Sequence, residues 1–246
     1  MNENDHMLTN KVEEKNIFLG GKTVSLRAPD IEKDVIQGEW HSWFNNIDNT
    51  KYLTHGVFPV TRDQQADYVK AAIESSSTML LCIVQKQTDR HIGVISLKAI
   101  DLTNRMAEIG IVMSPLKLSG GEAIEAMALL IRHAFSRLNL ESLHAGQHEA
   151  LWKWVNSLSM LGFRIDGFRE HGGYRDCRRH GTFHTSVSAT DFFALEAGRG
   201  GDILNPTPLD VLRRRPKFNP AIALRQSLLD MNLASQPAGT GTRTGI

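Results

Sequence analysis

Apolar and polar residues alternate in three neighbouring segments in the first half of the chain. The segments 78–87, 91–101 and 105–114 follow this period of two, and the short polar sequences TDR and LTN separate them. A period of two is typical of strands, and short polar connections favour turns between antiparallel neighbours. The pattern therefore predicts an antiparallel meander of three strands.

A long helix is predicted after residue 120. Ile124, Met127, Ile131 and Phe135 lie three or four positions apart, so they share one helix face. Acidic residues lie near its beginning and basic residues near its end, as the helix dipole favours. An earlier helix, which ends near residue 75, is predicted by the capping-box sequence that begins at Thr61.

The other segments predict a mixed α/β fold. Residues 23–30 alternate like a first strand, and a helix that carries Ile36 and the aromatic residues 40–44 follows. After the long helix, the pattern predicts a strand at 141–148, a further helix, and two strands between 162 and 189 around an arginine-rich turn. Strands thus outnumber helices, and most of them follow one another directly.

The composition changes after residue 195. Residues 196–246 are rich in Gly, Pro, Thr and Arg, with one short amphipathic stretch at 221–231. This composition is typical of a mobile tail, and the short stretch leaves open a docking helix for a second subunit or carrier. The sequence also predicts a polar extension at residues 1–15, before the folded domain.

A glycine pair stands where a strand leads into the long helix. Gly120 and Gly121 follow the strand AEIGIVMS and open the helix EAIEAMALLIRHAFSRL. Unpaired backbone N–H groups and the positive end of the helix dipole converge at a helix N-terminus. A phosphate-bearing ligand is therefore expected there.

Two motifs extend this expectation to a family. Gly121, Ala123, Glu125 and Ala126 form a G-x-A-x-E-A arrangement, and the sequence L-G-F ends at Phe163. Their order and spacing resemble the GNAT acyltransferase superfamily over residues 16–195. The resemblance implies an α/β (α+β) fold with a mixed, mostly antiparallel sheet of about seven strands, splayed between the fourth and fifth strands and flanked by helices.

The same resemblance implies acetyl-CoA as the cofactor and assigns residues to it. The splayed strand would hold pantetheine, and the loop that enters the helix would hold the pyrophosphate, both through backbone groups. The pantetheine-binding residues would be Ile111, Val112 and Met113; the pyrophosphate-binding residues would be Leu118, Ser119, Gly120, Gly121, Glu122 and Ala123.

Amide formation from a thioester needs a base for the attacking amine and no covalent enzyme intermediate. Glu108, which shares a strand face with Gly110 and Val112, is the first candidate base, and His148 is the alternative. Tyr174 is the candidate acid for the leaving thiolate.

Three residues depart from the family pattern. Leu118 replaces a Gln or Arg, Leu151 replaces an Asn, and Thr185 stands near the position of a frequent tyrosine acid. These departures leave open a degenerate domain that binds acyl-CoA without catalysis. The retained Gly120, Gly121 and Glu108 favour an acyltransferase.

The acceptor is predicted from a subgroup resemblance. The segments 39–61 and 91–111 resemble GNAT enzymes that act on nucleotide-linked amino sugars in surface-polysaccharide pathways. That resemblance implies N-acetyl transfer to a 4-amino sugar, and aromatic walls suit such a ligand. The implied acceptor-binding residues are Trp40, Trp43, Asn45, Tyr52, His55 and Phe58. Two alternatives stay open: the tryptophans belong to the core, or the acceptor is a protein N-terminus, as in the ribosomal-protein alanine acetyltransferases.

Composition narrows the partners. A net charge of +1 does not favour nucleic acid or an acidic membrane surface. The polar start and the lack of a long apolar run predict a cytoplasmic protein without a membrane span. Histidine pairs four residues apart lack an H-E-x-x-H motif or cysteine pairs, so no metal site is predicted. The expected partner is a small-molecule amine, and a homodimer is left open.

Overall fold

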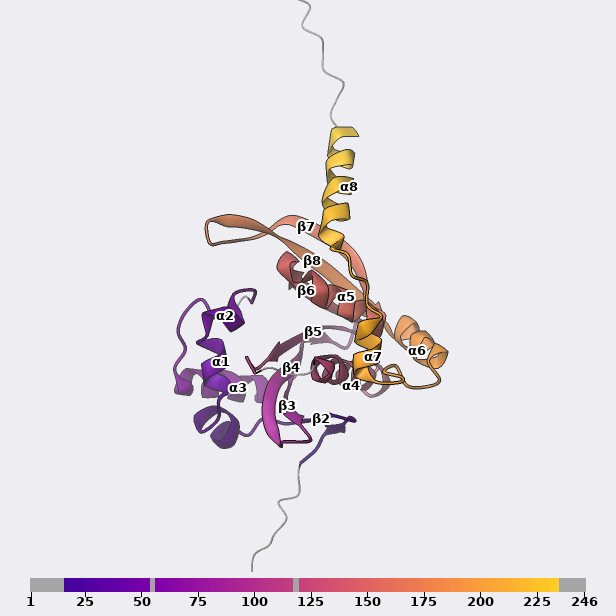
Figure 1. The fold of residues 1–246 in the computed structure, drawn as a ribbon. Coiled ribbons are helices and arrows are strands. Elements are labelled where there is room, and N and C mark those ends of the chain that lie inside the picture. Colours follow the sequence, from indigo (N-terminus) through magenta and orange to yellow (C-terminus); the bar gives the residue numbers. More distant parts are fainter. Residues whose placement is uncertain (1–15, 54–55, 117–119, 235–246) are drawn as a thin grey trace, which may run out of the picture.

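The computed structural model describes residues 16–53, 56–116 and 120–234, and one mixed sheet of eight strands organises them (Figure 1). The strand order is β1-β2-β3-β4-β5-β6-β8-β7, and every neighbouring pair is antiparallel except β5 and β6. The strands are β1 (Leu19–Gly20), β2 (Val24–Arg27), β3 (Met79–Gln85), β4 (Arg90–Asp101), β5 (Met106–Met113), β6 (Ser142–His148), β7 (Arg164–Arg175) and β8 (Arg178–Ser188). The predicted meander is confirmed as β3–β4–β5.

The predicted splay is confirmed between β5 and β6, the fourth and fifth predicted strands. Their parallel pairing is limited to Met106 with Ser142, Ala107 with Leu143 and Glu108 with His144. Both strands continue beyond these pairs, β5 to Met113 and β6 to His148. The second half of β5 therefore has no strand partner on that side among the described residues, and backbone groups there are available to a ligand.

Eight α-helices and three helical segments of other types accompany the sheet in the described residues. The helices are α1 (Trp40–Phe44), α2 (Ile47–Thr50), α3 (Arg62–Glu74), α4 (Gly121–Ser136), α5 (Trp152–Leu158), α6 (Ala189–Gly198), α7 (Pro208–Arg213) and α8 (Pro220–Ala234), and the other helical segments are η1 (Ile31–Ile36), η2 (Glu149–Leu151) and η3 (Ser159–Leu161). The predicted capping box of α3 is confirmed, because Thr61 and Gln64 exchange side-chain and backbone hydrogen bonds. None of the described helices is long and apolar enough to cross a bilayer.

The prediction of one helix that carries both Ile36 and Phe44 is wrong. The chain forms η1, bends at Gly38 and begins α1 only at Trp40. A Cβ atom on Gly38 would lie 2.2 Å from the carbonyl oxygen of Asp34. The backbone therefore turns too tightly at this position for a continuous helix with a side chain there.

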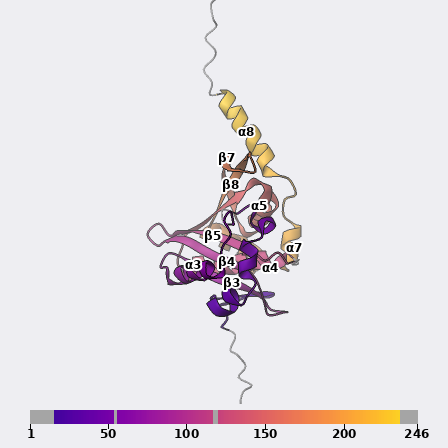
Figure 2. The ribbon, with the colours of Figure 1, turned by 90° about the vertical axis from the view of Figure 1, so that its left-hand side faces the viewer.

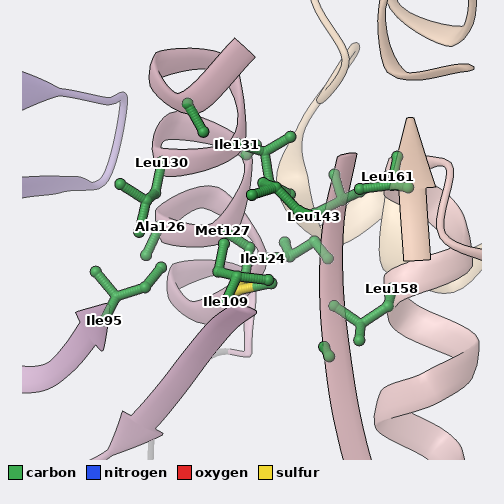
Figure 3. Packing of buried hydrophobic residues seen from close by; sticks show 14 of the residues in the cluster. Ile95, Ile109, Ile124, Ala126, Met127, Leu130, Ile131, Leu143, Leu158 and Leu161 are labelled. Atoms are coloured by element: carbon green, nitrogen blue, oxygen red, sulfur yellow. The ribbon is translucent and has the colours of Figure 1, made fainter. Parts of the chain in front are cut away.

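The sheet has a hydrophobic core on each face. Because successive strand residues point to opposite faces, Ile83 packs toward α4 and its neighbour Cys82 packs toward α1 and α3. Figure 3 shows the larger core, in which Met127, Leu130 and Ile131 of α4 lie among strand residues. The alternating patterns that predicted the strands thus match two separate cores.

Truncating Leu130 tests the larger core. Leu130 is fully buried, so Leu130→Ala leaves a cavity, and we expect a loss of about 2–5 kcal/mol in the free energy of unfolding. Urea denaturation measures this loss in the free energy of unfolding. The matched control is Leu229→Ala on α8, where the side chain is 50% exposed and the expected change is within about 0.5 kcal/mol. Equal losses in both variants would contradict this core assignment.

The C-terminal region is not the mobile tail predicted from composition. Helix α6 runs across the predicted domain boundary at residue 195, and Ile203, Leu204 and Leu212 belong to the larger core. Ala221, at the start of α8, is buried against Val155 and Phe183. The rest of α8 extends away from the body of the molecule in both views (Figures 1 and 2). The folded unit therefore includes residues 196–221. Their composition is dominated by small and polar residues, so it does not indicate the apolar contacts that they make with distant segments.

A buried polar network ties η1 to β2, β3 and β4. Arg27 donates two hydrogen bonds to the Asp34 carboxylate, at 2.7 and 2.6 Å. Burial would raise the pKa of Asp34, but the hydrogen bonds from Arg27 and from the Asp30 N–H outweigh it, and the pKa lies below its usual value. Burial lowers the pKa of the neighbouring His91 to about 4 and raises that of the Cys82 thiol. His91 and Cys82 are therefore both neutral near pH 7.

Candidate active site

A cavity of about 530 Å³ opens where β5 and β6 diverge. Residues of both strands line it, together with α1, α5 and the β7–β8 hairpin. Its lining includes apolar side chains such as Met127 and Trp154. The polar groups Glu108, His148 and Tyr174 line it as well. The cavity therefore brings together the three candidate catalytic residues, which are far apart in the sequence.

Glu108 lies at the last paired position before β5 and β6 separate. Its neighbours across the sheet are Lys98 on β4 and His144 on β6. Glu108 is exposed, and it is the only carboxylate among the described residues that line the cavity. Lys98 is half-buried and lines the same cavity. Its place opposite Glu108 explains this, because cross-strand partners share one face.

His148 lies at the end of β6 with its ring between two other rings. Its ring centroid is 4.9 Å from that of Tyr52 and 4.6 Å from that of His180. The Ala150 N–H donates to His148 Nδ1 at 3.1 Å. Burial, His180 and Arg175 lower the pKa of His148, although Glu149 opposes them.

This hydrogen bond sets the tautomer of His148. An amide N–H can only donate, so Nδ1 is the acceptor and the proton of the neutral ring is on Nε2. His148 therefore offers a donor at Nε2 and no free lone pair for an acceptor amine. The geometry favours Glu108 over His148 as the base.

The β7–β8 hairpin covers one end of the cavity. Arg175 near its tip donates to the carbonyl oxygens of Lys51 and Leu53, at 2.6 and 2.7 Å. The adjacent Tyr174 lines the cavity and is 72% exposed. Arg175 thus holds the hairpin against the chain segment that follows α2, a contact between residues more than 120 positions apart.

Glu149 connects this end of the site to α8. Its carboxylate accepts from the Gly181 N–H at 2.8 Å and forms an ion pair with Arg225 of α8. Burial would raise the pKa of Glu149, but these two partners outweigh it and the pKa is lowered. The pair therefore stabilises the fold above the unfolded pKa of about 4.3, and this contribution is lost as the pH falls through the lower folded pKa.

We expect Glu149→Gln to loosen the base of α8. Removing a half-exposed ion pair of about 1 kcal/mol should raise amide hydrogen exchange at Gly181 about fivefold at pH 7. Acidification below pH ~4 should lower the protection of the same amide in the wild-type chain, measured relative to its intrinsic exchange rate at that pH. Asp230→Asn, an exposed change on α8, is the control. Unchanged exchange in Glu149→Gln would contradict this anchor.

The predicted pantetheine-binding residues lie on the half of β5 that pairs with β4 but not with β6. Ile111 and Val112 line the cavity, whereas Met113 packs against the larger core and is not among the described lining residues. The side-chain amide of Asn49 on α2 donates to the Met113 carbonyl at 3.4 Å. This contact takes one backbone acceptor of the splayed edge, and no local sequence signal connects Asn49 with Met113.

Within the predicted pyrophosphate loop, residues 118–123, one glycine has a backbone conformation in the left-handed region. Gly120, with φ of 91°, precedes α4, and Gly121 and Ala123 lie in the first turn of that helix. The Glu122 side chain is buried and accepts from Gln85 at 3.3 Å, so any contact with pyrophosphate would be through its backbone. Leu118 and Ser119 lie outside the described residues.

The predicted acceptor-binding residues separate into two groups. Trp40 and Tyr52 line the cavity, and Trp40 does so with only 1% of its surface exposed. Trp43 is 1% exposed in the core formed with Val69, and the amide of Asn45 is engaged by the Val60 backbone. These two, and Phe58, are absent from the described cavity lining; Phe58 is 80% exposed. For Trp43 the structure therefore favours the alternative that the sequence left open, a place in the core. His55 lies outside the described residues.

Comparison with known proteins decides the family. The family model described as Acetyltransferase (GNAT) domain matches residues 24–164, more than half of the chain. The chain belongs to the GNAT acetyltransferase family. It is 29% identical over 150 residues to the uncharacterized N-acetyltransferase p20 of Bacillus licheniformis, covering 58% of this chain and 80% of that protein.

Solved GNAT structures share the fold. A GCN5-related N-acetyltransferase from Brucella melitensis superposes with a TM-score of 0.63 at 20% identity, covering 79% of this chain and 93% of that chain. Spermidine N-acetyltransferase from Vibrio cholerae, solved with CoA and spermine, gives a TM-score of 0.64 at 18% identity, covering 70% and 99% respectively.

This GNAT chain is an acetyl-CoA-dependent N-acetyltransferase. Two observed features fit that cofactor: the unpaired edge of β5 and the glycine that precedes the N-terminus of α4. When bound, acetyl-CoA supplies the acetyl group as a thioester. The resemblance deduced from the G-x-A-x-E-A and L-G-F motifs is confirmed at the level of the family, the enzyme class and the cofactor.

Proposed function

We propose that this N-acetyltransferase acts on the amino group of a nucleotide-linked amino sugar, with Glu108 as the general base. The observation that carries the proposal is the charge of the cavity lining. Glu108 is the only carboxylate among the described lining residues, and the cations Lys98 and Arg175 line the same cavity. An acceptor with an anionic diphosphate suits this balance better than a polycation does.

Three residues of the cavity have proposed roles in the acetyl transfer. Glu108 takes a proton from the acceptor ammonium, directly or through one water, so that the neutral amine can attack. His148 donates from Nε2 and thus orients a hydroxyl or carbonyl oxygen of the acceptor. Tyr174 is retained as the proposed acid for the leaving thiolate, from its place on the cavity wall.

The shape of the acceptor end supports a small molecule. Tyr52 offers aromatic surface, and sugars present apolar as well as hydroxyl faces. Arg175 holds the β7–β8 hairpin against residues 51–53, which narrows the space that an extended peptide would need. Acetylation of a protein N-terminus is therefore the less favoured alternative.

CoA-thiol release from acetyl-CoA tests the proposal on four amines. The panel contains a nucleotide-linked 4-amino sugar, the same sugar without the nucleotide, an alanine-terminated peptide and spermidine, the substrate named for the Vibrio relative. We expect the highest kcat/KM with the nucleotide-linked sugar. Turnover of the peptide or spermidine alone would overturn the proposed acceptor. Acetyl-CoA binding with no turnover of any amine would favour the binding module.

A further inference from the structure

Three potential metal ligands meet on the sheet face opposite α4. They are Asp34 of η1, Cys82 of β3 and His91 of β4, and their ligand atoms all lie within 4.8 Å of one another. The site is not part of the cavity described above, although Trp40 and Trp43 pack edge-on against His91, with ring centroids 5.5 and 4.9 Å apart. No local spacing connects these three residues, because the cluster forms only when η1 packs across two strands.

The hydrogen bonds of His91 leave one nitrogen directed at the cluster. His91 Nε2 lies 2.9 Å from the Gly93 carbonyl oxygen. A carbonyl can only accept, so Nε2 carries the proton and Nδ1 of the neutral ring carries a lone pair. Nδ1 lies 3.5 Å from Asp34 Oδ1, so two acceptors face each other. Metal-binding histidines commonly donate their other ring N–H to a backbone carbonyl in this way.

Asp34 retains one acceptor position on the same side. Its Oδ2 accepts from Arg27, from the Asp30 N–H and from the Cys82 S–H, whereas among the described residues Oδ1 accepts from Arg27 alone. A carboxylate oxygen has two lone pairs, so one on Oδ1 is available beside His91. The Cys82 sulfur lies 3.5 Å from Oδ2. Arg27 keeps part of its side chain in solvent, so its charge, which opposes a cation, is partly screened.

We propose that Asp34, Cys82 and His91 bind a zinc ion. A thiolate, an imidazole and a carboxylate form a donor set that suits Zn²⁺. Tetrahedral coordination at usual zinc–ligand lengths separates ligand atoms by about 3.3–3.6 Å, close to the 3.5 Å between His91 Nδ1 and Asp34 Oδ1. The ligand atoms of all three residues lie within 4.8 Å of one another. On binding, the Cys82 S–H bond breaks, a Zn–S bond forms and the proton leaves to solvent. The ion would join η1, β3 and β4 behind Trp40.

Cobalt substitution tests this site in the full-length chain. Chelator-treated, reduced protein is titrated with Co²⁺, and we expect a thiolate-to-cobalt charge-transfer band that saturates at one equivalent and is displaced by Zn²⁺. Cys177→Ser, which changes the exposed second cysteine, should keep the band, and Cys82→Ser should lose it. Zn²⁺ should raise the Tm of the wild type and Cys177→Ser only.

Two further variants complete the cobalt test. If circular dichroism shows that Cys82→Ser does not fold, Cys82→Ala replaces it, because a buried cysteine behaves as a small apolar residue. His91→Gln should weaken Co²⁺ binding about tenfold or more. The absence of a band in the wild type, or a band that persists without Cys82, would overturn the proposal and leave the cluster as a hydrogen-bonded network. Neither result depends on the acceptor of the acetyl transfer.

Discussion

Glu108→Gln should lower kcat by about 10²–10⁴-fold near neutral pH, because glutamine cannot accept the proton of the acceptor amine. Glutamine keeps the size of the side chain and its place on β5 between Lys98 and His144. The pantetheine-binding edge lies further along β5, so the affinity for acetyl-CoA should not change. Steady-state kinetics and calorimetric titration with acetyl-CoA measure the two quantities separately.

The control for this variant is Glu141→Gln. Glu141 is an exposed residue that pairs with Arg105 at 3.5 Å, outside the cavity lining. It should leave kcat and the acetyl-CoA affinity unchanged. If Glu108→Gln retained full turnover, Glu108 would not be the base; if both variants lost turnover equally, the loss would reflect the fold and not proton transfer.

Gly120→Val should weaken acetyl-CoA binding about 10- to 100-fold. Gly120 has φ of 91°, which a β-branched residue adopts only at a cost of about 1–3 kcal/mol. A Cβ atom there would meet no atom of the described residues within 4 Å, so the expected effect comes from the backbone conformation and not from a clash. The helix N-terminus would then present its N–H groups differently to the pyrophosphate.

Gly198→Val provides the matched control. Gly198 ends α6 and has no positive φ, and a Cβ atom there would also lie more than 4 Å from every atom in the part of the chain that the structure describes. Isothermal titration should give wild-type acetyl-CoA affinity for this variant. Unchanged affinity in Gly120→Val would contradict the assignment of the cofactor loop, whereas unfolding of that variant by circular dichroism would show that the glycine supports α4 itself.

Local patterns predicted the elements whose stability depends on one face. The β3–β4–β5 meander and α4 were predicted because their apolar positions match the two cores. The break at Gly38 was missed, since a close approach to the Asp34 carbonyl leaves no periodic signal. The packing of residues 196–221 was missed for a related reason: Ala221 is buried by residues more than 35 positions away.

Residues of the candidate site could be predicted from the sequence only where a single strand or loop places them there. Glu108 and His148 were chosen because they lie on or beside the splayed strands, and both line the cavity. Lys98 and the contacts of Arg175 depend on how distant segments pack. Trp43 resembled an acceptor residue in sequence, but an aromatic residue near a cleft and one in the core have the same local pattern.

The measurement that tests the central claim most directly is kcat/KM for the nucleotide-linked 4-amino sugar and for the same sugar without its nucleotide, at low and high salt. The cavity charges predict a clear preference for the anionic acceptor, and this preference should fall as salt screens Lys98 and Arg175. Equal kcat/KM for the two sugars, or a higher value for spermidine, would contradict the account.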